Sequence, residues 1–124
     1  MRRNGFGILI ILYVFATHGV LLSQERITPS QALKYIGKSA TVCGRVASAN
    51  FALRTKGQPT FLNLDRPYPD QIFTVLIWGD VRDRFQSPPE KNYSAKKICV
   101  TGRISTFRGR AEIVVKDASQ ITTE

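Results

Sequence analysis

TVCGRV, residues Thr41–Val46, is the segment around which the fold is organised, because its pattern returns later in the chain. Valine, a variable residue, glycine, arginine and a β-branched residue recur at Val100–Ile104, 58 residues further on. Alternating β-branched residues are typical of half-buried strands, and a glycine within a strand indicates a bend or the close approach of another backbone. The two copies therefore predict two bent strands that pair in one small closed sheet.

A cysteine accompanies each copy, Cys43 in the first and Cys99 beside the second. If the strands are antiparallel, both cysteines fall on the face opposite the valines, where a cross-strand bridge is geometrically reasonable. A disulfide of this loop length contributes about 4 kcal/mol in the chain-entropy model. The alternative, a redox-active thiol pair, lacks the Cys-x-x-Cys spacing. We therefore predict a structural disulfide between Cys43 and Cys99.

The amino-terminal residues predict export. Arg2 and Arg3 precede an uncharged, apolar run over residues 6–22, which the polar residues Ser23 and Gln24 follow. This layout is typical of a secretory signal peptide, and disulfides form in the compartments that such a peptide reaches. We expect residues 1–24 to be a signal peptide and residues 25–124 to be a single domain, periplasmic or secreted and not membrane-bound after cleavage. An uncleaved anchor is the alternative, although the run is shorter than the roughly 20 residues of a spanning helix.

The charge of the chain indicates an anionic partner. Eighteen Lys and Arg stand against nine Asp and Glu in 124 residues, a formal net charge of +9. Without residues 1–24, which hold two arginines, the net charge is +7. Nucleic acid, an acidic polymer or an anionic membrane surface would suit such an excess. A basic surface that is merely solvated is the other interpretation.

Turn residues and alternating apolar residues divide the rest of the chain. Thr28, Pro29 and Gln31 predict the start of a short helix that ends at Gly37. Strands are expected at residues 40–49, 60–65, 73–78, 97–105 and 111–116. A short helix at 81–85 and an irregular loop at 87–95 separate the third and fourth strands, a tight hairpin turn spans 106–110, and 117–124 is a loop and fraying end. This order predicts an all-β fold, a five-stranded Greek-key OB-fold barrel in which strand one pairs with strands two and four.

Several motifs, in this order, carry a resemblance to a known group. They are Val42-x-Gly44-Arg45-Val46, Lys56-Gly57, Thr60–Asp65, Val100-x-Gly102-Arg103-Ile104 and Arg108-Gly109-Arg110. Over residues 36–121 the chain resembles an OB-fold nucleic-acid-binding domain of the tRNA-anticodon-binding type. Similar domains are attached to some secreted bacterial nucleases, so the resemblance implies an exported bacterial protein in which this domain stands alone. The cysteine pair and the lack of an adjoining catalytic domain depart from the pattern.

The resemblance also implies a binding face. OB-folds generally bind their ligand on strands two and three, between the loops that follow strands one and four. Aromatic side chains there stack on bases, and basic side chains neutralise phosphates. The candidate nucleic-acid-binding residues are Arg45, Phe51, Arg54, Lys56, Phe61, Asn63, Arg103, Phe107, Arg108 and Arg110.

Simpler roles compete for some aromatic and basic residues. Phe61 belongs to the core if the amino-terminal helix covers its face. Arg45 and Arg103 could pair with Asp65 or Glu112 and take no part in binding. Tyr68, between two prolines, could brace a turn, whereas Phe73 and Trp78 lie in an apolar strand and are expected in the core.

Catalysis has little support in the sequence. The single histidine, His18, lies in the predicted leader, so residues 25–124 offer no imidazole base. We therefore expect a non-enzymatic module without cofactor or metal that binds single-stranded DNA or RNA. One alternative is a periplasmic interaction or stress protein whose ligand is an envelope protein or an anionic polymer. Another is a calcium-dependent nuclease that uses Asp65, Asp70, Asp80 and Asp83, although acids at turns and helix starts have ordinary capping roles.

Overall fold

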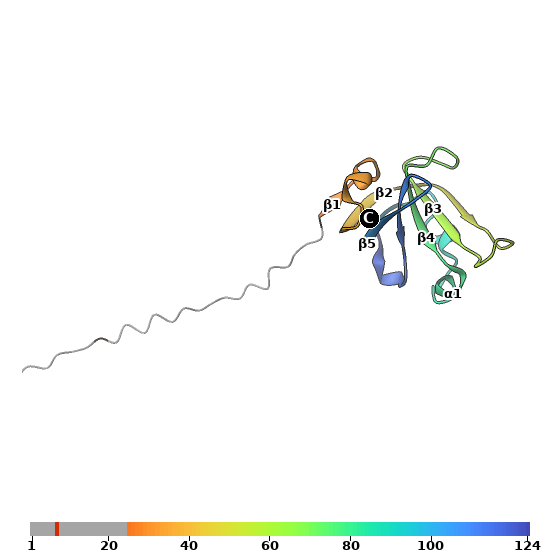
Figure 1. Cartoon of the computed structure of the whole chain (residues 1–124). Coiled ribbons are helices and arrows are strands. Elements are labelled where there is room, and N and C mark those ends of the chain that lie inside the picture. The colour runs from red at the N-terminus through yellow and green to blue at the C-terminus, as the bar shows by residue number, and fades with distance from the viewer. Residues whose placement is uncertain (1–6, 8–24) are drawn as a thin grey trace, which may run out of the picture.

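The repeated motif lies on two long strands, β2 (Ser39–Phe51) and β5 (Lys97–Phe107), in a computed structural model that describes residue 7 and residues 25–124. The two strands pair antiparallel, with Val42 opposite Val100 and Cys43 opposite Cys99, and lie side by side in Figure 1. The predicted pairing of the two motif strands is therefore confirmed. The predicted signal peptide lies, apart from Gly7, outside the described residues.

The sheet has seven strands, not the five predicted. The other five are β1 (Arg26–Ile27), β3 (Thr60–Leu64), β4 (Phe73–Ile77), β6 (Arg110–Val114) and β7 (Ile121–Thr123). Pairings run from β2 through β3, β4, β6 and β5 and return to β2. The added strands lie at the edges, where β1 pairs parallel with β2 and β7 pairs antiparallel with β5. The prediction of an all-β fold is confirmed.

Four short helical elements complete the described chain: η1 (Pro29–Tyr35), α1 (Gly79–Arg82), α2 (Pro89–Asn92) and η2 (Ala118–Gln120). The predicted amino-terminal helix forms, but as a 3-10 helix. Its start follows the predicted cap, because Gln31 Oε1 accepts a hydrogen bond of 2.9 Å from the backbone N–H of Thr28. Gly37, two residues beyond the end of η1, adopts a φ of +82°, the left-handed conformation expected just after a helix end. No helix in residues 25–124 is long and apolar enough to span a membrane.

Two segments expected to be irregular are ordered. Helix α2 lies within 87–95, and η2 and β7 occupy most of 117–124. Asp117 caps η2, since its carboxylate accepts a 2.8 Å hydrogen bond from the N–H of Ser119. Ile121 is then buried opposite Val100. The prediction of a fraying end was wrong because one buried isoleucine and a local cap fix the last residues to β5.

The core lies inside the curled sheet. Leu62 and Leu64 on β3 and Phe73, Val75 and Ile77 on β4 are fully buried. Residues between them in the sequence point to the outer face, as alternation requires. These residues, Asn63, Thr74 and Leu76, are also largely buried, so further side chains and loops cover the outer face of β3 and β4.

The structure confirms the prediction for the motif glycine and contradicts the one for Trp78. A Cβ at Gly44 would lie 2.8 Å from Asp65 Oδ1 and 2.9 Å from Pro29 Cγ, so the predicted close approach at the motif glycine is confirmed. Trp78, expected in the core, is 41% exposed. It follows Ile77 and so belongs with Thr74 and Leu76 on the outward-facing side of β4.

Candidate nucleic-acid interface

A groove of about 610 Å³ lies over the outer face of the sheet. The strand register sets the residues of its floor in rows. One row crosses four strands as Ser48, Asn63, Thr74 and Glu112, and Asn50 pairs with Phe61 in the next. The β5–β6 hairpin and the β3–β4 loop supply the walls. The resemblance to OB-folds predicted a binding face on the second and third strands of the expected order. These strands are β3 and β4, and their outer face is part of the floor of this groove.

Hydrogen bonds fix the centre of the floor. Asn63, only 4% exposed, donates from Nδ2 to Ser48 Oγ at 3.0 Å and accepts at Oδ1 from Thr74 Oγ1 at 2.7 Å. Ser48 Oγ also accepts a 3.0 Å hydrogen bond from the backbone N–H of Tyr68. Because both ends of the Asn63 amide are engaged within the protein, this side chain orders the floor and the loop above it.

Three aromatic side chains border the groove. Phe61 is half-buried in the floor, so the amino-terminal helix does not remove it into the core. Phe107 near the hairpin tip is 60% exposed, and Tyr68 in the β3–β4 loop is 72% exposed. Exposed apolar side chains that gather in one place are typical of an interaction site, whereas single ones are common on any surface. The three rings together give the groove aromatic surface at its floor and on both walls.

The hairpin tip places a cation beside one of these rings. Arg108 and Gly109 form a two-residue turn with φ angles of +51° and +79°, between the paired residues Phe107 and Arg110. These angles and this length are those of a type I′ turn. The guanidinium of Arg108 lies 5.1 Å from the centroid of the Phe107 ring. The predicted tight hairpin is confirmed, and it exposes one aromatic and one cationic group together.

Arg110 joins the two walls. Its Nη2 donates a 2.9 Å hydrogen bond to the carbonyl of Pro69. The side-chain oxygen of Gln71, in the amide orientation that satisfies both of its neighbours, accepts from Nη1 at 3.0 Å. A guanidinium with these partners is held in place, so Arg110 acts first as a brace between the hairpin and the β3–β4 loop.

A carboxylate lies in this otherwise neutral or basic groove. Glu112 stands opposite Thr74 on one side and Ser105 on the other. Burial disfavours the charged form and raises the pKa of Glu112 above its ordinary value. No basic side chain in residues 25–124 forms an ion pair with it. Glu112 therefore opposes the binding of an anion at the floor when it is ionised.

Some predicted site residues lie elsewhere. The guanidinium of Arg82 lies 3.7 Å from the ring centroid of Phe51, and Phe51 does not line the groove. Arg45 donates from Nη1 to the carbonyl of Ala95 at 2.7 Å, and Arg103 lies opposite Ser39. Neither arginine forms an ion pair with Asp65 or Glu112 among the described residues; Asp65 instead accepts from the backbone N–H of Arg45.

Arg54 and Lys56 lie in the β2–β3 loop and line a second, neighbouring hollow of about 780 Å³. Of the ten residues predicted from the sequence, the groove brings together Phe61, Asn63, Phe107, Arg108 and Arg110.

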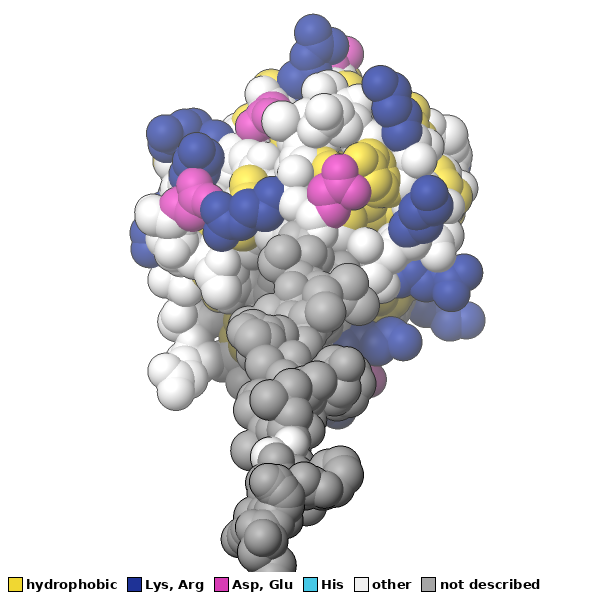
Figure 2. Space-filling model, turned by 90° about the vertical axis from the view of Figure 1, so that its left-hand side faces the viewer, with side chains coloured by type: hydrophobic (Ala, Val, Ile, Leu, Met, Phe, Trp, Pro, Cys, Tyr) yellow, Lys and Arg dark blue, Asp and Glu magenta, His cyan; other side chains and the backbone are white. Residues whose placement is uncertain are grey.

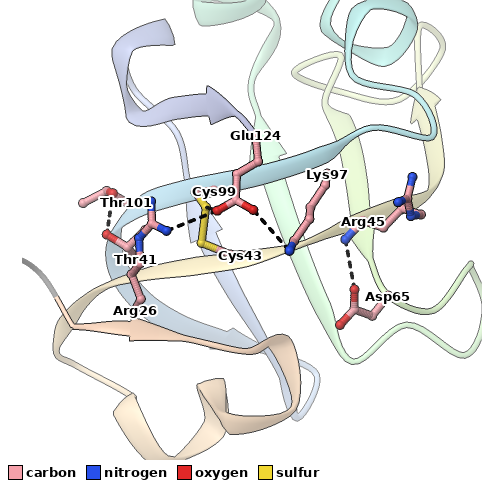
Figure 3. Close-up of a disulfide and its surroundings, with 9 residues drawn as sticks. All are labelled: Arg26, Thr41, Cys43, Arg45, Asp65, Lys97, Cys99, Thr101 and Glu124. Atoms are coloured by element: carbon pink, nitrogen blue, oxygen red, sulfur yellow. Dashed lines mark hydrogen bonds and ion pairs between the residues drawn. A yellow bond between two sulfur atoms is a disulfide. The ribbon is translucent and has the colours of Figure 1, made fainter.

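The predicted disulfide is present. Cys43 and Cys99 are joined, with Cα atoms 4.0 Å apart and a sequence separation of 56 (Figure 3). Glu124 lies over the bridge, with Oε1 3.0 Å from Cys99 Sγ and 3.2 Å from Arg26 Nη1, and with Oε2 3.2 Å from Lys97 Nζ. Since an oxidised sulfur carries no proton, the contact between Glu124 and Cys99 is not a hydrogen bond. The bridge and its ion pairs lie with Arg45, outside the groove.

Potential metal ligands gather at one place in the described part of the chain. Cys43, Cys99 and Glu124 are the one group of three such residues there, and both sulfurs belong to the disulfide. The acids considered for a calcium-dependent nuclease, Asp65, Asp70, Asp80 and Asp83, form no such group among the same residues.

Basic side chains are spread over one face of the molecule. On the face shown in Figure 2, Lys and Arg occur in several separate places with Asp and Glu between them. No single unbroken basic patch covers that face. On that face the positive charge is therefore spread and not gathered into one site, and the net positive charge of the chain contributes a general positive field.

Sequence reasoning missed the residues that complete the groove. Ser48, Tyr68, Gln71, Thr74 and Glu112 were not predicted as site residues, yet all line it. Alternation gave a usable signal for Thr74 and Glu112, because each lies between buried residues of a predicted strand. Ser48 follows an irregularity in the β2–β3 register between Val46 and Ser48, which alternation alone does not locate.

Comparison with known proteins gives a likeness of fold. No family model matches this sequence, and no curated protein matches it. Asparaginyl-tRNA synthetase from Pyrococcus horikoshii matches with a TM-score of 0.53 at 15% identity, over 80% of this chain and 23% of the synthetase. Aspartyl-tRNA synthetase from Entamoeba histolytica matches with a TM-score of 0.50 at 16% identity, over 83% of this chain and 22% of the synthetase. This chain thus spans about a fifth of each synthetase, and the likeness is one of fold with that part of each enzyme.

Proposed function

We propose that this chain is an exported, non-catalytic OB-fold module that binds single-stranded nucleic acid in the groove over β3, β4 and β6. One observation carries the proposal. Phe61, Phe107 and Tyr68 open onto the same groove beside Arg108, whose guanidinium forms no ion pair among residues 25–124. Aromatic faces next to an available cation suit a polymer of stacked bases and phosphates.

The groove favours a single strand over a duplex. Bases within a duplex are stacked on each other and offer only their edges, whereas unpaired bases offer their faces to aromatic side chains. The exposed rings of Phe107 and Tyr68 line the groove from two different loops, and successive bases could stack on them and on Phe61. Backbone phosphates would then face outward, toward Arg108 and the general positive field.

Two further observations are consistent with this proposal. The fold resembles parts of two enzymes named as tRNA synthetases, which suits nucleic-acid binding as a class. The Cys43–Cys99 disulfide suits an oxidising compartment and hence the export predicted from the leader. In the OB-fold interpretation, β2, β3, β4, β5 and β6 form the five-stranded barrel, and β1 and β7 extend it at the edges.

A salt titration of binding tests the proposal. Fluorescence anisotropy of a labelled single-stranded oligonucleotide, as RNA and as DNA, is measured against residues 25–124 at several salt concentrations. We expect binding at low salt and a linear fall of log affinity with log salt, with a slope of about −0.7 for each phosphate contacted. Absence of binding to both oligonucleotides at micromolar protein and low salt would overturn the proposal.

Matched phenylalanine variants test the assigned face. Phe61→Ala and Phe107→Ala should each weaken binding by about 1–3 kcal/mol, the contribution of one stacked base. Phe51→Ala is the control, because Phe51 lies under Arg82 and outside the groove. Equal losses in all three variants would point to general destabilisation, and no loss in any would reject the groove as the binding face.

A further inference from the structure

We propose that Trp78 is an additional base-stacking site, and that a bound single strand continues from the groove across the β2–β3 loop to reach it. This inference rests on the proposed function. It concerns the second hollow, of about 780 Å³, whose lining residues apart from Thr55 do not belong to the groove.

Trp78 lies on the same outer side of β4 as the groove floor. Phe73, Val75 and Ile77 are fully buried, so Thr74, Leu76 and Trp78 point outward by alternation. Thr74 is in the groove, and each step of two residues along a strand covers about 6.6 Å. Trp78 therefore lies on the same side of β4 as the groove, two residues beyond Leu76, which is itself buried.

The ring of Trp78 is both exposed and fixed. It is 41% exposed, and a Cβ placed on Gly57 would lie 2.9 Å from its Cε3 and Cζ3 atoms. Gly57 has a φ of +80°, and its carbonyl accepts a 2.9 Å hydrogen bond from the N–H of Gly79. The β2–β3 loop thus supports one part of the indole and leaves the rest open. A fixed, open aromatic ring loses little conformational entropy when a base stacks on it.

The two hollows are continuous in their lining. Thr55, in the β2–β3 loop, lines both the groove and the hollow at Trp78. A nucleic-acid strand that stacks on Phe61 could therefore continue past Thr55 and reach Trp78. Leu53, which is 58% exposed, adds apolar surface beside the indole.

Charge indicates which part of a nucleotide this hollow receives. Arg54 and Lys56 line it together with Asp80 and Asp83, so its formal charges balance. A balanced site offers little net attraction to a phosphate, whereas stacking on an indole requires no charge. Trp78 should therefore contribute to affinity without adding to the dependence on salt.

The chain itself supplies the probe, because Trp78 is its single tryptophan. Intrinsic fluorescence is followed while oligonucleotides of about 4 and about 12 nucleotides are added, and anisotropy of the same oligonucleotides is measured in parallel. We expect the longer strand to quench Trp78 and the shorter to bind with little quenching. Trp78→Leu should lower affinity for the longer strand about tenfold at every salt concentration, with the slope unchanged.

Trp78→Phe is the matched variant, since it keeps an aromatic face where Trp78→Leu keeps only apolar volume. Binding of Trp78→Phe within about threefold of the parent protein, with the tenfold loss confined to Trp78→Leu, supports stacking. Binding by anisotropy without quenching, or equal affinity of Trp78→Leu and the parent protein, overturns the inference and leaves the proposed function intact. No binding by anisotropy at either length overturns both.

Discussion

Thr74 Oγ1 donates a 2.7 Å hydrogen bond to Asn63 Oδ1 at the floor of the groove, where both side chains are buried. The same amide donates a hydrogen bond to Ser48 Oγ, which also accepts one from the backbone N–H of Tyr68. One buried asparagine thus links three neighbouring strands with the loop that forms a wall of the groove. The floor is rigid because its polar groups satisfy one another.

Replacement of Asn63 by alanine should therefore lower stability as well as affinity. The change leaves the buried Thr74 hydroxyl without its acceptor and removes one hydrogen bond from the half-buried Ser48, at a cost of about 1–3 kcal/mol. Urea denaturation measures the loss. Thr74→Val removes one hydrogen bond at nearly constant volume, so we expect it to cost less than Asn63→Ala. A variant Asn63→Ala as stable as the parent protein would contradict this account of the floor.

Arg108 and Arg103 provide a matched test of charge. Arg108 stands at the hairpin tip beside Phe107, whereas Arg103 lies opposite Ser39, outside the groove. Each change to alanine removes one positive charge from the chain. We expect Arg108→Ala to reduce the slope of log affinity against log salt by about 0.7, the value for one phosphate on a single strand. Arg103→Ala should leave the slope nearly unchanged. Identical slopes for the two variants would show that charge acts without a defined site.

More of the fold than of the site could be predicted from the sequence, because the strands depend more on local patterns than the site does. Strands β2 to β6 could be predicted from short-range signals in the sequence. These signals are the alternation around Val42 and Val100 and the Arg108-Gly109 turn. Strand β7 could not be predicted in this way, because its three residues acquire their order from the contact of Ile121 with a strand distant in sequence.

The site depends on such distant contacts even more. Arg45 and Phe107 look equally suitable in the sequence, as a basic and an aromatic residue next to a motif. The register of β2 against β5 sends Arg45 toward Ala95 and the disulfide, while the hairpin turn carries Phe107 to the groove. Trp78 was misassigned for a related reason, since an apolar strand that ends at Ile77 leaves its next residue on the surface.

Glu112 should make stability and binding depend on pH. Its pKa is raised by burial, so the protonated form is favoured in the folded protein. The stability that this provides is complete below the ordinary pKa of a glutamate and is lost as pH rises through the raised value. We expect Glu112→Gln to melt like the parent protein near about pH 4 and at a higher temperature at pH 7.

The same variant should bind an oligonucleotide about two- to fivefold more tightly at pH 7, because it removes a negative charge from the floor. Asp70→Asn, which changes an exposed carboxylate in the β3–β4 loop, gives the baseline for both measurements. A melting temperature of Glu112→Gln that follows the parent protein at every pH would show that Glu112 does not experience the burial described.

The Cys43–Cys99 disulfide should support the fold and leave the groove unaffected. It joins strands that already pair directly, and it closes a separation of 56 residues. In the chain-entropy model its removal costs about 4 kcal/mol. The double variant Cys43→Ala, Cys99→Ala should therefore lose stability in urea to about the same extent as the parent protein treated with dithiothreitol, and the reductant should not affect the variant further.

Because the bridge lies with Arg26, Lys97 and Glu124 and not in the groove, the folded double variant should bind an oligonucleotide as the parent protein does. Loss of binding in a variant that remains folded would instead show that the bridge sets the geometry of the groove through β5, the strand that carries both Cys99 and Phe107.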